Sequence, residues 1–522
     1  MRTTPSSIRP LKRSVALALG ALAVAAWACS STGEQTSTDG GSGTGPAGGG
    51  GAARGGAAGL GTVSAGGAGT GASSGNGAVA GSGGAAAGAG ATGAVAGSRS
   101  SGGATSFGGA AGSSAAGNAG TAGVAGAGAG GTGTATCGAL APPVFSANVR
   151  INDDTGNGNQ AEVTLATGPG GLAIAAWGDS RSDRTCTFSV TKDGGRTWGR
   201  NVAIANVSGQ FVGDPAAAID AGGTLYAVCQ EYVNTDTGAG NIRLMTSTDQ
   251  GTTWSAVRTI QAAPDKPWAR GGTTEGTLFV SWLGNPGGLK RSTDRGQTWG
   301  ATQSLGSIIH GTDIVTSSSG LVHVPYNLDS DRNQLRYLRS VDGGATWEKP
   351  RDLIADMGSF CFSCNPRQHP IVGAASDPTG QSVAFTWSST MPGGQGDDDV
   401  WLLFSKDGGK TWTKPIRVND NASASRQFQP WVAVDSCGRV HVAWTDLRNG
   451  KNEVWYSRSA DPASGFEKNI QITDGRGSAN TDFLGDYKGL VVQGSDVLAV
   501  WQDTRRDSGD IYFSRAAGAA AP

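Results

Sequence analysis

SVDGGATW at residues 340–347 is the stretch of sequence that decides the fold. Its pattern, Ser/Thr-x-Asp-x-Gly-x-Thr-Trp, occurs five times, and each copy lies between short runs that alternate like β-strands, such as 399–404 and 415–418. In a tight hairpin the Asp carboxylate accepts backbone N–H bonds, Gly adopts a positive φ and Trp packs beneath the turn. We therefore expect these motifs, here called Asp boxes, to be structural. The five Asp boxes are residues 191–198, 247–254, 292–299, 340–347 and 405–412.

Two further units have kept the strands and lost the box. They pair residues 442–446 with 453–457, and residues 498–503 with 510–514. The last of these seven units ends after its third strand. The missing fourth strand occurs near the start of the domain, where residues 148–153 match the fourth strands at 415–420 and 469–474. A strand from the N-terminal side that completes the last blade closes a ring and removes its exposed edges.

The repeat pattern predicts an all-β fold, a seven-bladed β-propeller over residues 137–517. The third unit, residues 266–305, is the shortest, and six blades are the alternative if this unit is irregular.

The tract before the propeller differs in composition. Gly accounts for 88 of the 522 residues, and residues 29–136 are almost wholly Gly, Ala, Ser and Thr. Such a tract has too little apolar surface to offset its backbone entropy, so we expect a disordered stalk.

The N-terminus has the pattern of an export signal. Arg9, Lys12 and Arg13 precede an apolar run that begins at Val15 and ends at Trp27, which is too short to span a bilayer as a mature helix. We expect residues 1–28 to be a signal peptide. Residues 26–29, AWAC, resemble the bacterial lipobox, which implies cleavage before Cys29 and lipidation of its thiol. The protein is then a bacterial outer-membrane or cell-surface lipoprotein, with ordinary secretion as the alternative.

The charge balance excludes some partners. The formal net charge is −1, and the part after residue 136 contains no run of Lys or Arg. Such a chain has no field to attract nucleic acid, so we expect no nucleic-acid partner. We expect a monomer that contacts the membrane through the lipid on Cys29 and binds a glycan or another cell-surface ligand.

Six cysteines follow Cys29, an even number in a protein expected to be exported. Disulfides are therefore allowed, and their pairing cannot be deduced from sequence. The CFSC motif at 361–364 is spaced like a redox or haem motif. However, no βαβ pattern surrounds it, and Asn365 stands where haem attachment needs His. We expect a loop disulfide there. The six are Cys137, Cys186, Cys229, Cys361, Cys364 and Cys437.

The blade topology predicts where a ligand binds. The turn between strands three and four lies on the opposite face from the loop between strands two and three, so the Asp boxes mark the face away from the ligand. The ligand face carries the ends of second strands and the residues before first strands. A rim of Arg, carboxylates and one Tyr suits an anionic ligand, because Arg matches carboxylate oxygens. These positions include Arg181, Asp183, Asp214, Glu231, Lys266, Arg270, His310, Arg367, His369, Arg426 and residues 485–488.

Other polar residues have a simpler structural interpretation. Trp-x-Asp-x-Arg recurs in three blades, at 177–181, 444–448 and 501–505, whereas a catalytic residue is needed once. We interpret Asp446, Arg448, Asp503 and Arg505 as ion pairs between blades. His323 and His441 lie in second strands and are expected to be packed. Asp-rich loops such as 152–154 and 397–399 could hold Ca²⁺, but they lack a recognised ligand spacing. We therefore expect no metal, and we expect no cofactor.

Asp boxes are also known as bacterial neuraminidase repeats, and residues 148–516 resemble the sialidase superfamily. The resemblance implies a six-bladed propeller, three arginines that hold the sialic acid carboxylate, a Tyr nucleophile assisted by Glu, and an Asp acid/base. Residues 172–181 followed by Asp183 look like the family's first blade, and residues 485–490 fall where its Tyr is found. The implied roles are nucleophile for Tyr487, acid/base for Asp183, Tyr partner for Glu231, and substrate binding for Arg181, Arg367, Arg426 and His369.

Two features depart from the family pattern. The family's Arg-Ile-Pro motif enters the first inner strand, where this chain has Asn159-Gln160-Ala161, and Arg150-Ile151 belongs to the predicted closing strand. Seven blades also change the geometry of the funnel. We therefore carry two hypotheses. The first is a sialidase-like exo-glycosidase that hydrolyses sialic acid or another anionic glycan at the cell surface. The alternative is a non-catalytic propeller that binds glycan or protein.

Overall fold

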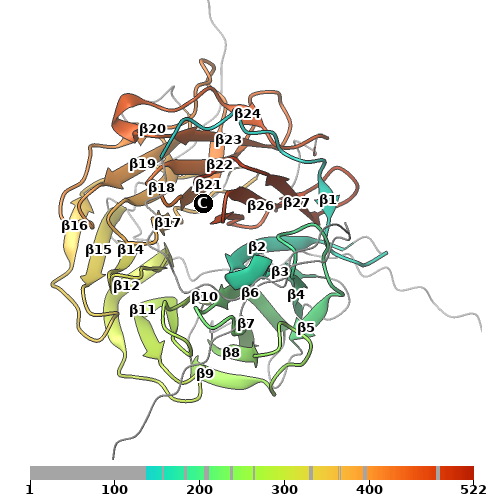
Figure 1. The fold of residues 1–522 in the computed structure, drawn as a ribbon, viewed down its shortest axis with the longest axis vertical. Coiled ribbons are helices and arrows are strands. Elements are labelled where there is room, and N and C mark those ends of the chain that lie inside the picture. The colour runs from blue at the N-terminus through green and yellow to red at the C-terminus, as the bar shows by residue number, and fades with distance from the viewer. Residues whose placement is uncertain are drawn as a thin grey trace, which may run out of the picture. The chain divides into compact units, whose positions relative to one another are not determined.

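The computed structural model describes residues 137–522 except for 156–157, 181–184, 205–210, 235–238, 263–264, 329–332, 362–363, 365, 392–396, 476 and 478–482. The described chain forms a ring of β-sheets around a central axis (Figure 1). The predicted signal peptide, the stalk and Cys29 lie outside the described residues, as do Arg181 and Asp183. Among the described residues, no helix has the length and apolarity needed to cross a membrane.

Seven blades make up the ring, as the repeat predicts. Blade 1 contains β2 (Gln160–Thr167), β3 (Ala173–Asp179), β4 (Thr185–Thr191) and β5 (Val202–Ile204). Blade 2 contains β6 (Phe211–Ile219), β7 (Leu225–Asn234), β8 (Ala239–Ser247) and β9 (Arg258–Ala262). Blade 3 contains β10 (Asp265–Gly271), β11 (Leu278–Ser292) and β12 (Gln303–Thr312). Blade 4 contains β13 (Val315–Thr316), β14 (Val322–Leu328), β15 (Gln334–Ser340) and β16 (Arg351–Ile354).

The remaining blades follow the same order from the axis outward. Blade 5 contains β17 (Gly373–Ser376), β18 (Val383–Ser389), β19 (Asp399–Ser405) and β20 (Ile416–Arg417). Blade 6 contains β21 (Gln427–Val434), β22 (Val440–Asp446), β23 (Glu453–Ser459) and β24 (Ile470–Gln471). Blade 7 contains β25 (Gly489–Gln493), β26 (Asp496–Asp503), β27 (Asp510–Ala516) and β1 (Val149–Arg150). Two short 3-10 turns, Pro169–Gly171 and Pro462–Ser464, are the described helical elements.

The third unit is irregular, yet the ring still has seven blades. Its second and third strands are continuous in β11, which pairs with β10 on one side and with β12 on the other. β12 then also pairs with β14 of the next blade, so that blades 3 and 4 share one sheet. The predicted six-bladed alternative is therefore not the architecture of this chain.

β1 closes the ring as predicted. It pairs antiparallel with β27, with Val149 opposite Phe513 and Arg150 opposite Tyr512. Figure 1 shows the closing strand lying outside β27. Asn148 and Asp474 also join blade 7 to blade 6: each backbone N–H donates to the other side chain, at 2.9 Å and 2.8 Å. This closure covers the outer edge of β27 with a fourth strand.

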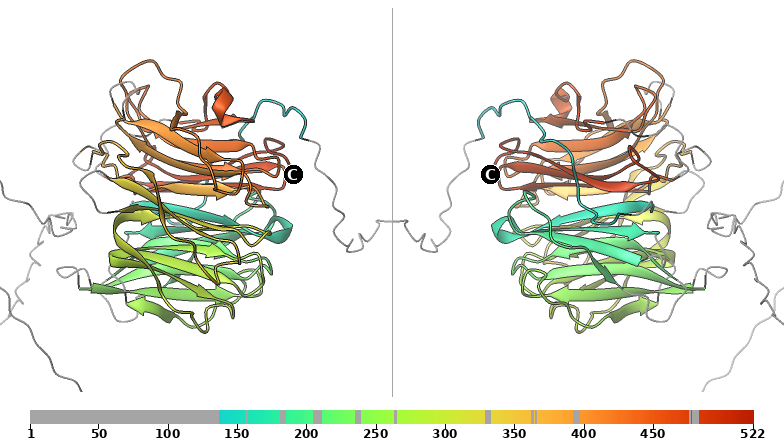
Figure 2. Two further views of the ribbon diagram at one scale, coloured as in Figure 1. Left: turned by 90° about the vertical axis from the view of Figure 1, so that its left-hand side faces the viewer. Right: turned by 90° about the vertical axis from the view of Figure 1, so that its right-hand side faces the viewer.

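The hydrophobic core lies between neighbouring blades. Successive sheets stack against each other, as the side views in Figure 2 show. One buried cluster joins β3 and β4 of blade 1 to β6 and β7 of blade 2, and another joins blade 7 to blade 1. Second strands contribute the largest fully buried side chains, namely Trp177, Trp387, Trp444 and Trp501. Burial of this apolar surface is the main force that holds the ring together.

The Asp boxes form the hairpins expected of them. In the box of blade 4, Thr346 N donates to Asp342 Oδ1 at 2.8 Å, and the Thr346 hydroxyl donates to the other carboxylate oxygen. These bonds from Thr346 lower the pKa of Asp342 to about 2. The box Trp packs across the blade interface, since Trp254 lies 4.4 Å from Phe188 of blade 1, measured between ring centroids.

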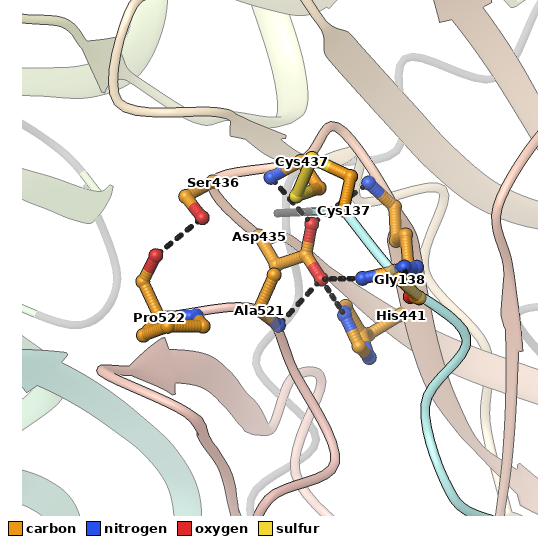
Figure 3. The surroundings of a disulfide bond; sticks show 9 residues. Cys137, Gly138, Asp435, Ser436, Cys437, His441, Ala521 and Pro522 are labelled. Carbon is orange, nitrogen blue, oxygen red and sulfur yellow. Dashed lines mark hydrogen bonds and ion pairs between the residues drawn. A yellow bond between two sulfur atoms is a disulfide. The ribbon is translucent and has the colours of Figure 1, made fainter. Parts of the chain in front are cut away.

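Three disulfides link the six cysteines. Cys186–Cys229 joins β4 of blade 1 to β7 of blade 2, and Cys361–Cys364 lies in the loop before β17. Cys137–Cys437 fastens the segment before β1 to the turn between β21 and β22. Figure 3 shows this turn, where Asp435 lies beside the disulfide and accepts a bond from Ala521 N at 2.8 Å. Both ends of the described chain are therefore attached to blade 6.

Candidate functional site at the axis of the ring

The first strands of neighbouring blades contact one another and line the axis. Four of them contain a β-bulge with a non-glycine residue at positive φ: Glu162 at 60°, Asp214 at 45°, Lys266 at 42° and Gln429 at 51°. Such a conformation is costly for an L-residue and persists only where the surroundings hold it. Bulges redirect side chains. In three of the four strands, the residue at positive φ is charged.

Two of these residues, Glu162 and Asp214, contact a third, Lys266. Lys266 Nζ lies 2.9 Å from Asp214 Oδ1, 2.9 Å from Asp486 Oδ2 and 3.4 Å from Glu162 Oε1. Arg367 binds Asp486 through two nitrogens, at 3.1 Å and 2.7 Å. The contacts join blades 1, 2, 3, 5 and 7. We define the axial cluster as Glu162, Asp214, Asp265, Lys266, Arg367 and Asp486.

Tyr232 connects two carboxyl groups of the axial cluster. Its hydroxyl contacts Asp214 Oδ2 and lies 2.9 Å from Asp265 Oδ1. Burial and then the negative charge of Asp214 raise the pKa of Asp265 to about 7. Burial also raises the pKa of Tyr232 well above its ordinary value, so the phenol stays neutral.

The other carboxyl groups of the axial cluster differ in their affinity for protons. Burial, followed by the charge of Asp214, raises the pKa of Glu162 well above its ordinary value. Burial also acts to raise the pKa of Asp214, but the charge of Lys266 and the hydrogen bonds from Tyr232 and Lys266 together outweigh it, and the pKa is lowered. Burial likewise acts to raise the pKa of Asp486, but Lys266, His369 and Arg367 together lower it. The cluster therefore contains a carboxyl group that keeps its proton beside carboxylates that lose theirs.

An aromatic layer lies beside the charged cluster. The rings of Trp268 and Trp431 stack with centroids 5.5 Å apart, and Tyr487 meets Trp268 edge to face at 4.7 Å. Gly485 brings blade 7 close to blade 1, because an added Cβ would lie 2.5 Å from Glu162 N. A cavity about the size of one water molecule lies between blades 6 and 7 and is lined in part by Tyr487 and Lys488.

Lys488 is buried, and its ammonium donates to uncharged oxygens. Its Nζ donates to Gln429 O at 2.9 Å and to Thr445 Oγ1 at 2.7 Å. Burial lowers the pKa of Lys488 to about 7. This lysine is therefore no permanent cation of the ligand face.

The predicted substrate arginines within the described chain already have partners. Arg367 is paired with Asp486, and its side chain is 33% exposed. Arg426 Nε lies 2.9 Å from Asp398 Oδ2, and its Nη1 donates to Pro366 O at 2.9 Å. Predicted His369 lies beside Asp486 at 3.8 Å, and burial lowers its pKa to about 4.

Tyr487 and Glu231 each bind a different partner. The Tyr487 hydroxyl donates to Pro215 O at 3.4 Å, and burial raises the pKa of Tyr487 well above its ordinary value. Glu231 instead binds Arg243 of the neighbouring strand, with Arg243 Nε 2.7 Å from Glu231 Oε2. That pair lies inside blade 2, where each charge compensates the other. The roles assigned to Arg181 and Asp183 fall outside the described residues.

The recurring Trp-x-Asp-x-Arg motif forms ion pairs between blades, as interpreted from the sequence. Arg448 Nη2 lies 2.8 Å from Asp446 in its own blade, and Nη1 lies 2.8 Å from Asp420, which follows blade 5. Arg505 Nη2 lies 2.6 Å from Asp503 Oδ2 in its own blade, and Arg505 Nη1 pairs with Asp474, which follows blade 6. His323 and His441 are fully buried, and each contacts a Tyr hydroxyl, at 2.6 Å and 2.7 Å.

Glu162 and Asp265 are the members of the axial cluster that the sequence analysis missed. Glu162 lies in an unremarkable stretch, QAEVTLA, without a motif of its own. A signal was nevertheless present, since three other first strands contain a polar residue followed by Pro: Asp214-Pro215, Lys266-Pro267 and Gln429-Pro430. Proline cannot donate to a strand ladder and is typical of bulges. Aligning these dipeptides with Glu162-Val163 places Glu162 at the axis.

Within the described part of the chain, no group of three or more His, Cys, Asp or Glu side chains has an arrangement that could hold a metal ion. The charged groups described at the axis are carboxyl groups, a lysine and an arginine. Proton donors and proton acceptors lie side by side there.

Part of the chain matches a protein family. Residues 326–484 match the family described as the BNR repeat-like domain. The xyloglucanase Xgh74A of Acetivibrio thermocellus is 27% identical over 207 residues, which cover 34% of this chain. The match covers 22% of that enzyme, so the chain spans about a fifth of its relative's length.

Three solved structures illustrate the structural neighbours. A protein of unknown function from Dyadobacter fermentans is 15% identical, with a TM-score of 0.45 and coverage of 72% of this chain and 99% of that one. The α-L-arabinofuranosidase of Fusarium graminearum with arabinobiose is 13% identical, with a TM-score of 0.42 and coverage of 72% and 98%. The leech intramolecular trans-sialidase is 12% identical, with a TM-score of 0.40 and coverage of 59% and 67%. None of these likenesses carries an argument about ligand or reaction.

Proposed function

We propose that this chain, a seven-bladed propeller of BNR repeats, is a glycoside hydrolase whose active site is the axial cluster. Glu162 is the proton donor and Asp214 is its carboxylate partner. The observation that supports the proposal is the opposite shift of their pKa values around Lys266. Glycoside hydrolysis needs one carboxyl group that holds a proton and one that is ionised.

Each residue has a defined task in this proposal. Protonated Glu162 donates its proton to the glycosidic oxygen as the bond to the leaving sugar breaks. Ionised Asp214 stabilises the positive charge that develops on the sugar ring, and either attacks the anomeric carbon or takes a proton from the attacking water. Lys266 contacts both carboxyl groups and so keeps them in mutual reach. Arg367 holds Asp486 beside them.

The predicted sialic acid substrate is a narrower form of the proposal. It requires cations that are available to a carboxylate, with Tyr487 as nucleophile, Asp183 as acid/base and Glu231 as the Tyr partner. Arg367 and Arg426 are each engaged by an aspartate, and Glu231 is engaged by Arg243. Arg181, the third of the predicted arginines, lies outside the described residues, and the broader proposal does not depend on it.

A matched set of variants tests the hydrolase. The purified protein is incubated with a panel of aryl glycosides that includes neutral sugars and an aryl α-sialoside, and release of the aryl group is followed. We expect turnover of at least one substrate and a loss of at least a hundredfold in Glu162→Gln and Asp214→Asn. Glu275→Gln is the control, because Glu275 forms an exposed ion pair with Arg295 away from the axis. Equal activity in Glu162→Gln and the control contradicts the assignment.

A binding propeller without catalysis is the second candidate. It is favoured by the pairing of both arginines and by the burial of Tyr487, which is 3% exposed. Retention of a glycan on the intact protein, with no product after prolonged incubation, supports this candidate over the hydrolase.

We also propose that the protein is exported and acts at the cell surface as a monomer, with a lipid on Cys29. Three disulfides support the proposal, because such bonds persist in oxidising compartments outside the cytosol. Mass spectrometry of the membrane fraction tests it: a diacylated N-terminal cysteine is expected, and Cys29→Ser should release the protein into the medium.

A further inference from the structure

A second cavity lies among the first strands, next to the axial cluster. Its volume is about 30 Å³, so it has room for about two water molecules. Two of the residues that line it, Thr164 and Trp268, follow Glu162 and Lys266 of the axial cluster by two positions each. The cavity therefore lies one step further along these strands than the axial cluster. We call it the axial cavity.

Two polar atoms of the residues that line the axial cavity have no hydrogen-bond partner within the described chain. They are Thr164 Oγ1 and Trp268 Nε1, and the two residues are only 8% and 4% exposed. A polar group that is buried without a partner destabilises the fold, so a partner is expected. An indole N–H can only donate. An occupant that satisfies Trp268 must therefore offer a hydrogen-bond acceptor.

Lys488 also lines the axial cavity, and among the described residues it has no ionic partner. Its Nζ donates to two oxygens of Gln429, the backbone O at 2.9 Å and Oε1 at 3.3 Å, and to Thr445 Oγ1 at 2.7 Å. All three acceptors are uncharged. Charges inside proteins are normally paired. A negative ion in the cavity would supply the counter-ion that the Lys488 ammonium lacks.

Asp313 contributes a carboxylate to the wall of the axial cavity, but this charge is already compensated. Its Oδ1 accepts the N–H of Ile314 at 2.7 Å, and its Oδ2 accepts the N–H of Ala374 at 2.9 Å. Arg270 lines the same cavity, and its Nη2 lies 3.4 Å from Asp313 Oδ1. Because Arg270 balances Asp313, a protonated Lys488 gives the described wall a net positive charge.

We propose that the axial cavity binds one small inorganic anion, a halide such as chloride, as the counter-ion of Lys488 and the acceptor for the indole N–H of Trp268. The hydroxyl of Thr164 is a further donor to the ion. Hydrogen bonds to an ionised partner are about twice as strong as those between neutral groups. A monatomic ion fits a space of this size, whereas a sugar ring does not. This site is additional to the proposed hydrolase and does not depend on it.

Urea unfolding of the full protein at pH 7 tests the proposal. Sodium chloride is replaced stepwise by sodium gluconate at constant ionic strength, because gluconate is too large for the cavity. An ion that binds only the folded chain raises the free energy of unfolding as its concentration rises. We therefore expect the urea midpoint to rise with chloride in the unaltered protein.

Three variants connect this dependence with the axial cavity. Lys488→Met should abolish it, and Trp268→Phe and Thr164→Val should each weaken the apparent chloride affinity by about tenfold or more. Trp254→Phe is the matched control. It also removes an indole N–H without a described partner, but Trp254 packs against Phe188 between blades 1 and 2. The control should keep the chloride dependence of the unaltered protein.

Anomalous diffraction from crystals grown in sodium bromide locates the ion directly. A bromide peak in the axial cavity supports the proposal. Peaks confined to the protein surface, with water in the cavity, show an adventitious ion only and overturn it. Equal stability in chloride and gluconate overturns it too, as does a Trp268→Phe variant that responds like Trp254→Phe. Failure of all glycosides to turn over contradicts the hydrolase and leaves the ion site standing, because neither measurement involves a substrate.

Discussion

Lys266 in blade 3 and Asp486 at the entrance of blade 7 lie 220 positions apart in the sequence, yet their charged atoms are 2.9 Å apart at the axis. The side chain of Lys266 is 8% exposed and that of Asp486 is fully buried. Breaking a buried ion pair on one side leaves a charge without compensation, which costs more than the pair contributes when intact. The contact therefore links the stability of the ring to the arrangement of the axial cluster.

Lys266→Met should destabilise the protein strongly. Removal of the ammonium leaves Glu162, Asp214 and Asp486 close together with Arg367 as the remaining cation. We expect the free energy of unfolding to fall by about 3–5 kcal/mol in urea titrations at pH 7. Lys290→Met is the control, since Lys290 binds the amide of Gln261 and no carboxylate. An effect of equal size in both variants contradicts the role given to Lys266.

Gly485→Ala should displace Glu162. Gly485 has a φ of 69°, and an added Cβ would lie 2.5 Å from Glu162 N, which belongs to the backbone and cannot move freely. Gly494→Ala is a matched control, because Gly494 has a φ of 58° and open space around the added atom. Both variants lose about 1 kcal/mol from the positive φ.

The clash at Gly485 adds to that cost and changes the axial site. We expect a lower melting temperature in Gly485→Ala than in Gly494→Ala, together with loss of glycan binding or turnover in Gly485→Ala alone. Similar melting temperatures and unchanged ligand binding in the two variants would contradict a close approach of blades 7 and 1.

The stability that His323 contributes should rise with pH between about 4 and 6.5. Burial lowers the pKa of His323 to about 4, whereas an unfolded histidine titrates near 6.5. Between these values the unfolded chain binds more protons than the folded chain, so the stability contributed by neutral His323 is lost as the pH falls through this window. His369 acts in the same direction. The expected size is about 1.4 kcal/mol for each unit by which a pKa is lowered.

His323→Leu separates this contribution from others. The variant loses the contact between His323 Nδ1 and the Tyr337 hydroxyl at every pH, but it has no proton to take up at this position. Urea unfolding at several pH values should therefore show the free energy of unfolding of the unaltered protein falling relative to that of the variant as the pH is lowered from about 6.5 to 4. Two parallel pH profiles would exclude His323 as a source of the acid sensitivity.

The Asp boxes should contribute stability that does not depend on the axial site. The hydroxyl and N–H of Thr346 lower the pKa of Asp342 to about 2, below the ordinary value near 3.8. This contribution is present above the ordinary pKa and is lost as the pH falls toward 2. We expect Asp342→Ala to lower the melting temperature at pH 7 and to leave ligand binding unchanged.

Asp352→Ala is the control for the box, because Asp352 forms an exposed ion pair with Arg336 in the same blade. Exposed ion pairs contribute about 0–1 kcal/mol. Loss of ligand binding in Asp342→Ala while the ring remains folded would argue against the separation of the two faces.

The amino-acid sequence by itself determined the fold, the number of blades and the closing strand. An Asp box encloses its hydrogen bonds within eight residues, as in residues 340–347, so its conformation depends on local sequence. Residues 148–153 could be matched to other fourth strands for the same reason. The interpretation of the motif at 444–448 as an ion pair between blades also followed from repetition, since a structural role recurs in each blade.

Only the tertiary structure decided which charges meet. Arg367 and Asp486 are 119 positions apart, and their contact depends on closure of the ring around the axis. The sequence shows Arg367 and Arg426 as cations without revealing their partners, so an anionic ligand was predicted. It also shows Glu162 as an isolated acid in a strand, because the bulge that turns it toward Lys266 is stabilised by residues of other blades. Long-range electrostatics depends on such juxtapositions, whereas hairpins depend on neighbours in the chain.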